Sequence, residues 1–291
     1  MDPTYGQELL VNGIVLGSSY ALLAAGLAVI FGVLDVVNFA HGALYMVGAF
    51  AAYFLMPETG YWLALAACVA IMAAVGVVLQ DGLLRRLPRD GAFSRTMLLT
   101  LGVAMILQNG AIVLWGAGPR QMPIDSVPRG QVSIGAAEIS MARALIVVVS
   151  AIALVTLWLL LSRTQIGRAM RGVSQNPTAA MVVGISPTAI GRIAMALGVG
   201  LAGLAGATLA PVFTVSTQMG LTIVFKVFAI VVIGGLGSVP GAVIVSFAVG
   251  FIESFAGGYG SAVTQSVTVF VVMIAVMLVR PQGLFSTEVR V

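Results

Sequence analysis

The charged residues of this chain are so far apart that the intervals between them are long enough to cross a lipid bilayer. The Glu8–Asp35 interval contains 26 uncharged residues, and the Arg192–Lys226 interval contains 33. A helix that crosses the hydrocarbon core needs about 20 predominantly apolar residues. Eight such intervals follow one another, and the shortest, Arg143–Arg163, contains 19 residues. The spacing predicts an all-α, polytopic membrane protein.

The composition excludes several classes of function. Only 8% of the 291 residues are charged and 60% are hydrophobic, whereas soluble domains carry about 25% charged residues. So few charges cannot cover a water-soluble protein, which excludes soluble enzymes and nucleic-acid-binding proteins. The single histidine, His41, excludes a histidine-rich metal site, and the single cysteine, Cys68, excludes an intramolecular disulfide. We predict no catalytic residues, no metal and no cofactor in this chain.

The basic residues predict the orientation of the chain, because loops rich in Lys and Arg stay on the cytoplasmic side of the membrane. Ten of the 14 basic residues fall in three groups. The groups are Arg85, Arg86, Arg89 and Arg95; Arg163, Arg168, Arg171 and Arg192; and Arg280 and Arg290. The N-terminus carries Asp2 and Glu8 and no cation. We expect an external N-terminus and a cytoplasmic C-terminus, which together require an odd number of crossings.

The apolar segments predict eight to ten transmembrane helices, most simply nine, of which two are unusually short. The expected helices cover residues 9–33, 42–55, 61–80, 96–115, 144–161 and 193–213, with two or three more between 223 and 278. We expect residues 116–140 to form the longest external loop and residues 162–192 to form a cytoplasmic loop. All segments belong to a single transmembrane domain, residues 1–291.

Two interruptions divide otherwise apolar sequence, one in each half of the chain. Their residues are Asn38, Phe39, His41 and Gly42 in the first, and Gly234, Gly235, Gly237 and Ser238 in the second. Non-helical backbone is tolerated at membrane depth only where it is buried in protein or lines a wet cavity. Paired interruptions of this kind point to the substrate pathway of a transporter. Both are also compatible with tight turns between helices at the membrane surface. We treat these residues as candidates for a translocation pathway.

Lys226 and Glu253 are the charges that lie deepest in apolar sequence. A charge at the bilayer centre costs about 2.5–3.5 kcal/mol, so each needs a partner or a route to the surface. An ion pair between them near the external surface is one interpretation, and a role in substrate passage is the other. For the polar insertions Ser18–Tyr20 and Gln108–Asn109 we expect interhelical hydrogen bonds rather than ligand contacts. Because the sequence has no series of acidic residues for a proton relay, we expect the energy for transport to come from outside this chain.

Small residues recur every fourth position from Gly198 to Ala210, and again at Gly13 and Gly17. Such faces let helix backbones approach closely in lipid. In the cytoplasmic loop, Asn176 followed by Pro177 is a good helix start, and Gly184 is a good helix end. We therefore expect a short helix over about residues 179–183.

Four motifs, taken in order, are similar to those of a known family. They are Val37–Ala43, Gly167–Ile185, Leu201–Ala207 and Gly234–Ala242. On these motifs the chain resembles, along nearly its whole length, the LivH-type permease subunits of branched-chain amino acid ABC transporters.

The resemblance implies an ABC-permease transmembrane domain in the bacterial inner membrane. It implies a heterodimer with a sister permease, two cytoplasmic ATPase subunits that use the ATP, and a periplasmic binding protein that delivers Leu, Ile or Val. It also implies that the loop between the central helices couples to the ATPases. The matching positions in this chain are Arg168, Arg171, Asn176, Pro177, Ala180, Gly184 and Ile185.

Two other functions remain compatible with the sequence. Permeases for urea or short-chain amides share this architecture, and a pathway of residues such as Phe39, Ala40 and Leu236 suits an aliphatic solute without excluding a small polar one. A passive solute channel explains the helices and the interruptions, but not the semi-apolar cytoplasmic loop.

Overall fold

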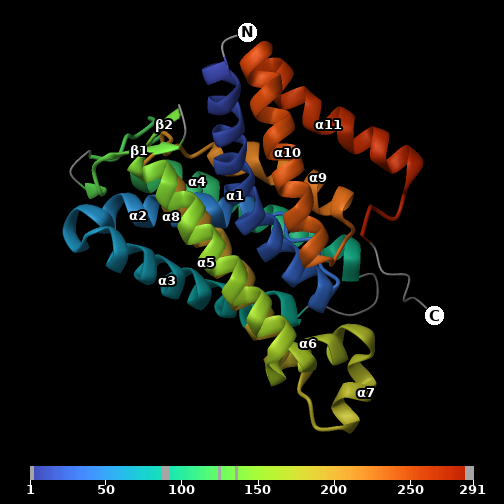
Figure 1. Ribbon diagram of the computed structural model, residues 1–291. Helices are drawn as coiled ribbons and strands as arrows, with labels where there is room; N and C mark the ends of the chain where they lie inside the picture. Colours follow the sequence, from blue (N-terminus) through green and yellow to red (C-terminus); the bar gives the residue numbers. More distant parts are fainter. Residues whose placement is uncertain (1–2, 87–91, 124–125, 135–136, 286–291) are drawn as a thin grey trace.

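The computed structural model describes residues 3–86, 92–123, 126–134 and 137–285, and most of them are helical (Figure 1). The helices are α1 (Pro3–Leu34), α2 (His41–Thr59), α3 (Tyr61–Gly82), α4 (Ala92–Trp115), α5 (Met141–Arg163), α6 (Gln165–Gln175), α7 (Pro177–Val182), α8 (Pro187–Leu209), α9 (Met219–Gly234), α10 (Val239–Tyr259) and α11 (Ala262–Val279). A short 3₁₀ turn, η1 (Leu84–Arg86), follows α3, and the strands β1 (Gln131–Ile134) and β2 (Ala137–Ser140) pair in antiparallel fashion.

Seven of the described helices are long and apolar enough to cross a membrane: α1, α3, α4, α5, α8, α10 and α11. The helix α9 is apolar but shorter, with 16 residues, and α2 begins and ends in polar sequence. With these two, the helices correspond to the nine predicted, and the prediction of an all-α, polytopic membrane protein is confirmed.

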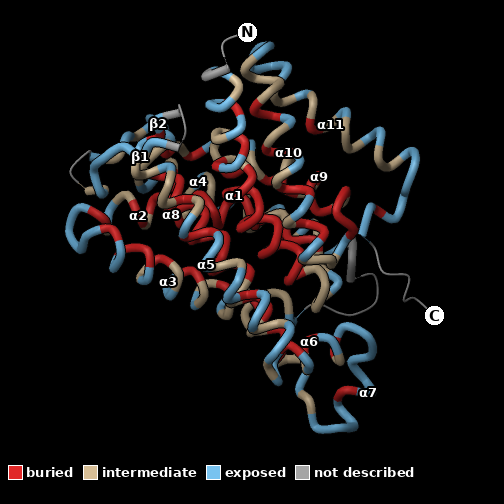
Figure 2. The backbone as a smooth tube through the Cα atoms, in the orientation of Figure 1, coloured by how far each residue is buried: buried red, intermediate tan, exposed pale blue. Residues whose placement is uncertain are grey.

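The helices α1 and α8 form the centre of the molecule. The most apolar stretch of α1 is 89% buried and that of α8 is 72% buried, whereas the corresponding values are 11% for α4 and 6% for α11. The helix α1 packs against α10, α8 and α5, and the helix α8 packs against α3, α2 and α1. Figure 2 shows the buried residues gathered in the middle of the molecule. The outer helices therefore carry most of the exposed apolar surface.

Small residues at the helix crossings allow this central packing. A methyl group added to Gly26 of α1 would lie 2.7 Å from the carbonyl oxygen of Gly198 in α8. One added to Gly48 of α2 would lie 2.5 Å from the Cα atom of Gly203. The backbones are thus in direct contact, as the small-residue pattern predicts.

The two ends of the molecule differ. The N-terminus and the β1–β2 hairpin lie at one end, where β2 contacts α1, and α6 and α7 project from the opposite end (Figure 1). The segment expected to be the longest external loop, residues 116–140, contains this two-stranded sheet. The predicted basic residues Arg89 and Arg290 lie outside the described residues.

Several helix bounds differ from the prediction. The helix α8 begins at Pro187 rather than residue 193, because the Ser186 hydroxyl caps it by accepting a hydrogen bond from the Ala189 N–H (3.3 Å). The helix α6 was not predicted at all. It begins where the Thr164 hydroxyl accepts a hydrogen bond from the Gly167 N–H (3.2 Å), and its residues Met170 and Val173 are buried.

Candidate functional site

The first interruption lies inside the protein. After α1 ends at Leu34, the chain returns along α1, and α2 begins at His41, whose Nε2 atom is 3.0 Å from the carbonyl oxygen of Leu23. Leu23 precedes the end of α1 by eleven residues, which corresponds to about 16 Å along the helix axis. His41 is only 1% exposed. The start of α2 is therefore enclosed by protein at the level of the middle of α1.

Side chains, rather than a helix, satisfy the backbone of this segment. The Asn38 side-chain oxygen accepts a hydrogen bond from the Ala40 N–H (3.0 Å). The Thr100 hydroxyl of α4 accepts a hydrogen bond from the Phe39 N–H (3.2 Å) and lies 3.3 Å from the carbonyl oxygen of Val37. Asn38 is 2% exposed, and its amide nitrogen has no hydrogen-bond partner among the described residues. Thr100 thus fastens the interruption to α4.

The second interruption is a tight turn between α9 and α10. The Ser238 hydroxyl accepts a hydrogen bond from the Gly241 N–H (3.2 Å) and caps α10. Gly237 has φ +85°, and a methyl group added to it would lie 3.2 Å from the Cα atom of Gly32 in α1. Both the backbone conformation and the close contact require glycine at position 237.

The segment that follows α11 covers this turn. The Leu284 N–H donates a hydrogen bond to the Ile233 carbonyl (2.8 Å), and the Phe285 N–H donates one to the Gly234 carbonyl (3.3 Å). These bonds satisfy the last carbonyl groups of α9, which have no partners within the helix. A methyl group added to Gly283 would lie 2.7 Å from Gly235. The residues Gly234, Gly235, Gly237 and Ser238 are therefore packed between α1 and the end of the described chain.

The helix α9 connects the two interruptions. Near its start, Gly220 is in contact with Gly42, and further along, the Phe228 ring lies 5.9 Å from the Phe39 ring, measured between centroids. The second interruption follows directly at its end. The predicted residues are thus arranged along one helix, but they do not share one cavity.

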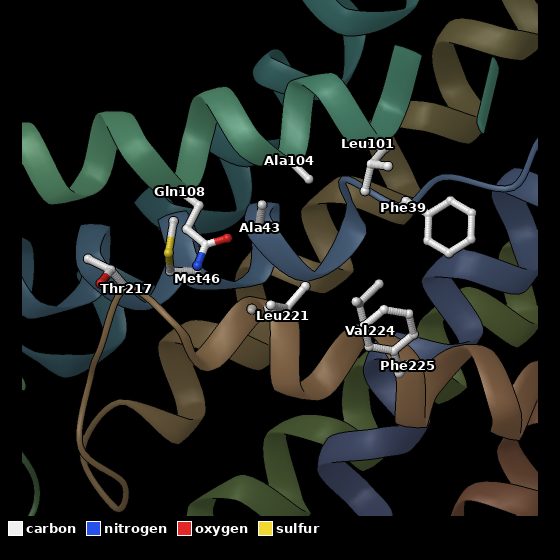
Figure 3. Close-up of a pocket in the computed structure, with 11 residues that line it drawn as sticks. Phe39, Ala43, Met46, Leu101, Ala104, Gln108, Thr217, Leu221, Val224 and Phe225 are labelled. Carbon is white, nitrogen blue, oxygen red and sulfur yellow. The ribbon is translucent and has the colours of Figure 1, made fainter. Parts of the chain in front are cut away.

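A pocket opens beside the first interruption, between α2, α4 and α9 (Figure 3). It is lined by Phe39, Ala43, Met46, Leu101, Ala104, Gln108, Thr217, Gly220, Leu221, Val224 and Phe225. Phe39 is the predicted pathway residue that reaches it. Most of the other lining residues could not be found from a local sequence pattern. For Gln108 the expectation of an interhelical hydrogen bond is wrong, since its side chain makes none within the described chain.

The deepest charges pair as one of the two interpretations predicts. The Lys226 amine forms an ion pair with the Glu253 carboxylate, and the Tyr20 hydroxyl donates a hydrogen bond to the other carboxylate oxygen (2.6 Å). Glu253 is completely buried, and 12% of the Lys226 side chain is exposed. The expectation of interhelical bonds holds for Tyr20. It is wrong for Ser19 and Asn109, whose side chains bond to carbonyl groups of their own helices.

Within the described residues, no three His, Cys, Asp or Glu side chains are grouped so that they could hold a metal ion. Some buried polar groups are instead paired with one another or bonded to backbone carbonyls, whereas the Asn38 amide nitrogen and the Ser150 hydroxyl have no hydrogen-bond partner among the described residues.

The segment predicted to couple to a partner folds as two short helices, α6 and α7. The Asn176 side chain accepts a hydrogen bond from the Ala179 N–H (2.9 Å) and starts α7, as predicted. Gly184 follows its end with φ +83°, and the Ile185 N–H donates a hydrogen bond to the Ala180 carbonyl (2.9 Å). The short helix and its glycine end are confirmed, with α7 covering Pro177–Val182 instead of residues 179–183.

The predicted coupling residues all lie in the projection formed by α6, α7 and the residues that follow α7. Arg168, Arg171, Asn176, Pro177 and Gly184 are exposed, Ala180 is buried and Ile185 is half-buried. Three apolar residues beside them, Met181, Val182 and Val183, are 48%, 84% and 73% exposed.

The attachment of this projection involves Arg171, whose guanidinium donates a hydrogen bond to the Leu161 carbonyl at the end of α5 (2.5 Å). The projection is therefore fastened to the body and ends in an apolar tip.

Comparison with known proteins covers nearly the whole chain. The profile of the family described as "Branched-chain amino acid transport system / permease component" matches residues 9–278. The chain is 29% identical to the high-affinity branched-chain amino acid transport system permease protein LivH of Escherichia coli K12, over 97% of this chain and 96% of that protein.

Two further relatives are similar over the same extent. The permease protein BraD of Pseudomonas aeruginosa is 29% identical over 96% of this chain and 95% of its own length. A probable branched-chain amino acid transport permease protein LivH of Methanocaldococcus jannaschii is 28% identical over 97% of this chain and 94% of its own length. On the extent of the profile match, the chain belongs to the family of branched-chain amino acid transport permease components, and it is a multi-pass membrane transport subunit rather than an enzyme.

Proposed function

We propose that this chain is one permease subunit of an ATP-driven importer for Leu, Ile and Val. The observation that carries the proposal is the full-length similarity to relatives named as high-affinity branched-chain amino acid permeases. We further propose that it assembles with a sister permease as a heterodimer, with two ATPase subunits, and with a periplasmic binding protein.

We propose that the molecule lies in the bacterial inner membrane with its N-terminus outside. The basic residues of the loop between α5 and α8 support this orientation, because Arg163, Arg168 and Arg171 lie at the end from which α6 and α7 project, opposite the N-terminus (Figure 1). The β1–β2 hairpin then faces the binding protein, and α7 faces the ATPases.

The coupling step in this proposal is mechanical. The exposed apolar tip of α7 docks on an ATPase subunit, and α8 begins three residues after Gly184. Because α8 packs along α1, α2 and α3, a displacement of its start reaches the crossing of Gly26 and Gly198. A methyl group added to Gly26 would lie 3.3 Å from the His41 ring, so this crossing adjoins the first interruption. ATP hydrolysis by the partners thereby moves the segment that borders the pocket.

The test is reconstitution of the chain with its sister permease, ATPase subunits and binding protein in proteoliposomes. We expect uptake of labelled leucine that requires ATP and the binding protein, with competition by isoleucine and valine but not by urea or acetamide. Uptake of urea or acetamide instead of leucine would assign the substrate to the amide class. Leucine uptake without ATP or the ATPase subunits would contradict the importer and indicate a passive channel.

A further inference from the structure

The pocket between α2, α4 and α9 separates polar from apolar groups. Figure 3 shows Gln108 and Thr217 at one end, and Phe39, Leu101 and Phe225 at the other. Gln108 and Leu101 are seven residues apart in α4, so about two helical turns, or roughly 10 Å, separate the two ends. No lining residue is charged. The pocket therefore has the polarity of a small amphiphilic molecule.

The two polar side chains lack partners within the described chain. Neither Gln108 nor Thr217 makes a hydrogen bond to another described residue. The adjacent Asn109, by contrast, donates a hydrogen bond to the Met105 carbonyl of its own helix (2.8 Å). An amide removed from water without a hydrogen bond is unfavourable, and lipid acyl chains offer no partner for it. A ligand in this pocket can therefore pair with both groups through hydrogen bonds.

We propose that this pocket is a transit site for an aliphatic α-amino acid, in which Gln108 and Thr217 bind the α-ammonium and α-carboxylate groups. The proposal rests on the proposed function and assigns a site to it. A carboxamide donates through nitrogen and accepts through oxygen, so Gln108 can serve either charged group of the zwitterion. The aliphatic side chain then lies against Phe39, Val224 and Phe225.

The pocket lining has no charged side chains, which favours a site that binds the amino acid briefly during transport over one that binds it tightly. A pathway site must bind its solute well enough to admit it and weakly enough to release it. Neutral hydrogen bonds meet this need, because a charged partner would hold the zwitterion more firmly. The pocket also borders the first interruption, where Thr100 accepts a hydrogen bond from the Phe39 N–H. Because the Phe39 ring forms part of the pocket wall, a shift of this segment changes the shape of the pocket.

The experiment compares Gln108→Leu with Asn109→Leu in the complete reconstituted complex. Both variants replace an amide by an apolar side chain at neighbouring positions of α4, but only position 108 lines the pocket. We expect Gln108→Leu, and likewise Thr217→Val, to lower ATP-driven leucine uptake at least tenfold. Assembly of the complex, and ATPase stimulation by the leucine-loaded binding protein, should stay within twofold of the unaltered complex. Asn109→Leu should retain normal uptake.

A second variant tests the apolar end through selectivity. Ala104→Leu narrows the pocket, so we expect the ratio of leucine to valine uptake to fall severalfold.

Unchanged uptake by Gln108→Leu would overturn the transit site while leaving the proposed function standing. Loss of assembly in Gln108→Leu alone would also overturn it, because Gln108 would then belong to a contact between permease subunits. Lack of ATP-driven uptake by the unaltered complex would instead refute the proposed function, and the transit site with it.

Discussion

Lys226 of α9 is ion-paired with Glu253 of α10, and the Glu253 side chain has no exposed surface. The Tyr20 hydroxyl of α1 donates a hydrogen bond to the same carboxylate. The helix α1 and the consecutive helices α9 and α10 therefore meet at a single buried carboxylate. This arrangement satisfies charges that would otherwise be costly inside a membrane.

Breaking this pair from one side should destabilise the protein more than removing both charges. Lys226→Met leaves the Glu253 carboxylate buried without its cation, and such a change costs about 3–5 kcal/mol. The double variant Lys226→Met with Glu253→Gln should recover most of that loss. The measurement is the temperature at which the folded protein is lost in detergent, followed by size-exclusion chromatography. A double variant no more stable than Lys226→Met would show that the pair does not determine stability here.

A more exposed pair provides the control for this prediction. Arg192 donates a hydrogen bond to Asp81 (2.8 Å), and the two side chains are 42% and 35% exposed. Exposed ion pairs contribute about 0–1 kcal/mol, so Arg192→Gln should change the same temperature little.

Glycine at the crossing of α2 and α8 should be intolerant of substitution. A methyl group at Gly206 would overlap the Tyr45 carbonyl oxygen and lie 2.8 Å from the Ala49 nitrogen. Overpacking of this kind costs about 1–3 kcal/mol, so Gly206→Ala should lower the melting temperature. In Gly102→Ala the added methyl group meets nothing within 4 Å, and this variant should be as stable as the unaltered chain or more so. Equal stability of the two variants would contradict close backbone packing at this crossing.

Loss of the Thr100 hydroxyl should loosen the first interruption. Thr100→Val keeps the side-chain shape but removes the hydroxyl that accepts the hydrogen bond from the Phe39 N–H, a bond worth about 0.5–1.5 kcal/mol. We expect faster hydrogen exchange at residues 37–40, measured by mass spectrometry. Thr156→Val is the matched control, because the Thr156 hydroxyl bonds only the Ile152 carbonyl of its own helix. Equal protection of residues 37–40 in both variants would show that Thr100 does not hold the segment.

A β-branched residue at Gly184 should uncouple ATP hydrolysis from uptake. Gly184 has φ +83°, and a β-branched side chain in such a conformation costs of order 1–3 kcal/mol, which shifts the end of α7. We expect Gly184→Val to hydrolyse ATP with little leucine uptake in proteoliposomes. Thr178→Val places the same side chain in the exposed part of α7 and should couple normally. A normal ratio of uptake to hydrolysis in Gly184→Val would count against the coupling role of α7.

Local sequence signals predict those features that depend on neighbouring residues in the chain. The Asn176–Pro177 start and the Gly184 end of α7 follow from capping alone. The pairing of Lys226 with Glu253 is predictable because isolated charges in lipid are costly. The same reasoning could have found α6 and the earlier start of α8, since Thr164 and Ser186 are both good N-caps.

Features that depend on how the helices are rotated and packed cannot be predicted from local sequence patterns. Gln108 and Asn109 are chemically similar neighbours, yet one lines the pocket and the other bonds its own helix, because about 100° separates adjacent residues around a helix axis. The start of α2 opposite Leu23 is likewise set by packing between distant segments. The pocket is therefore visible only once α2, α4 and α9 are placed together.

The burial of α1 has a consequence for the order in which this protein matures. Among the described helices α1 precedes all others in the chain, yet its main partners are α8, which begins more than 150 residues after α1 ends, and α10, which comes later still. A newly inserted α1 therefore remains in lipid without these two main partners for most of the synthesis of the chain. Its apolar and small residues tolerate that interval, because lipid is as apolar as the helices that eventually replace it. Tyr20 and Asn12 are exceptions, since the Tyr20 hydroxyl obtains its acceptor only when Glu253 arrives and the Asn12 amide obtains its acceptor only when Ser254 arrives.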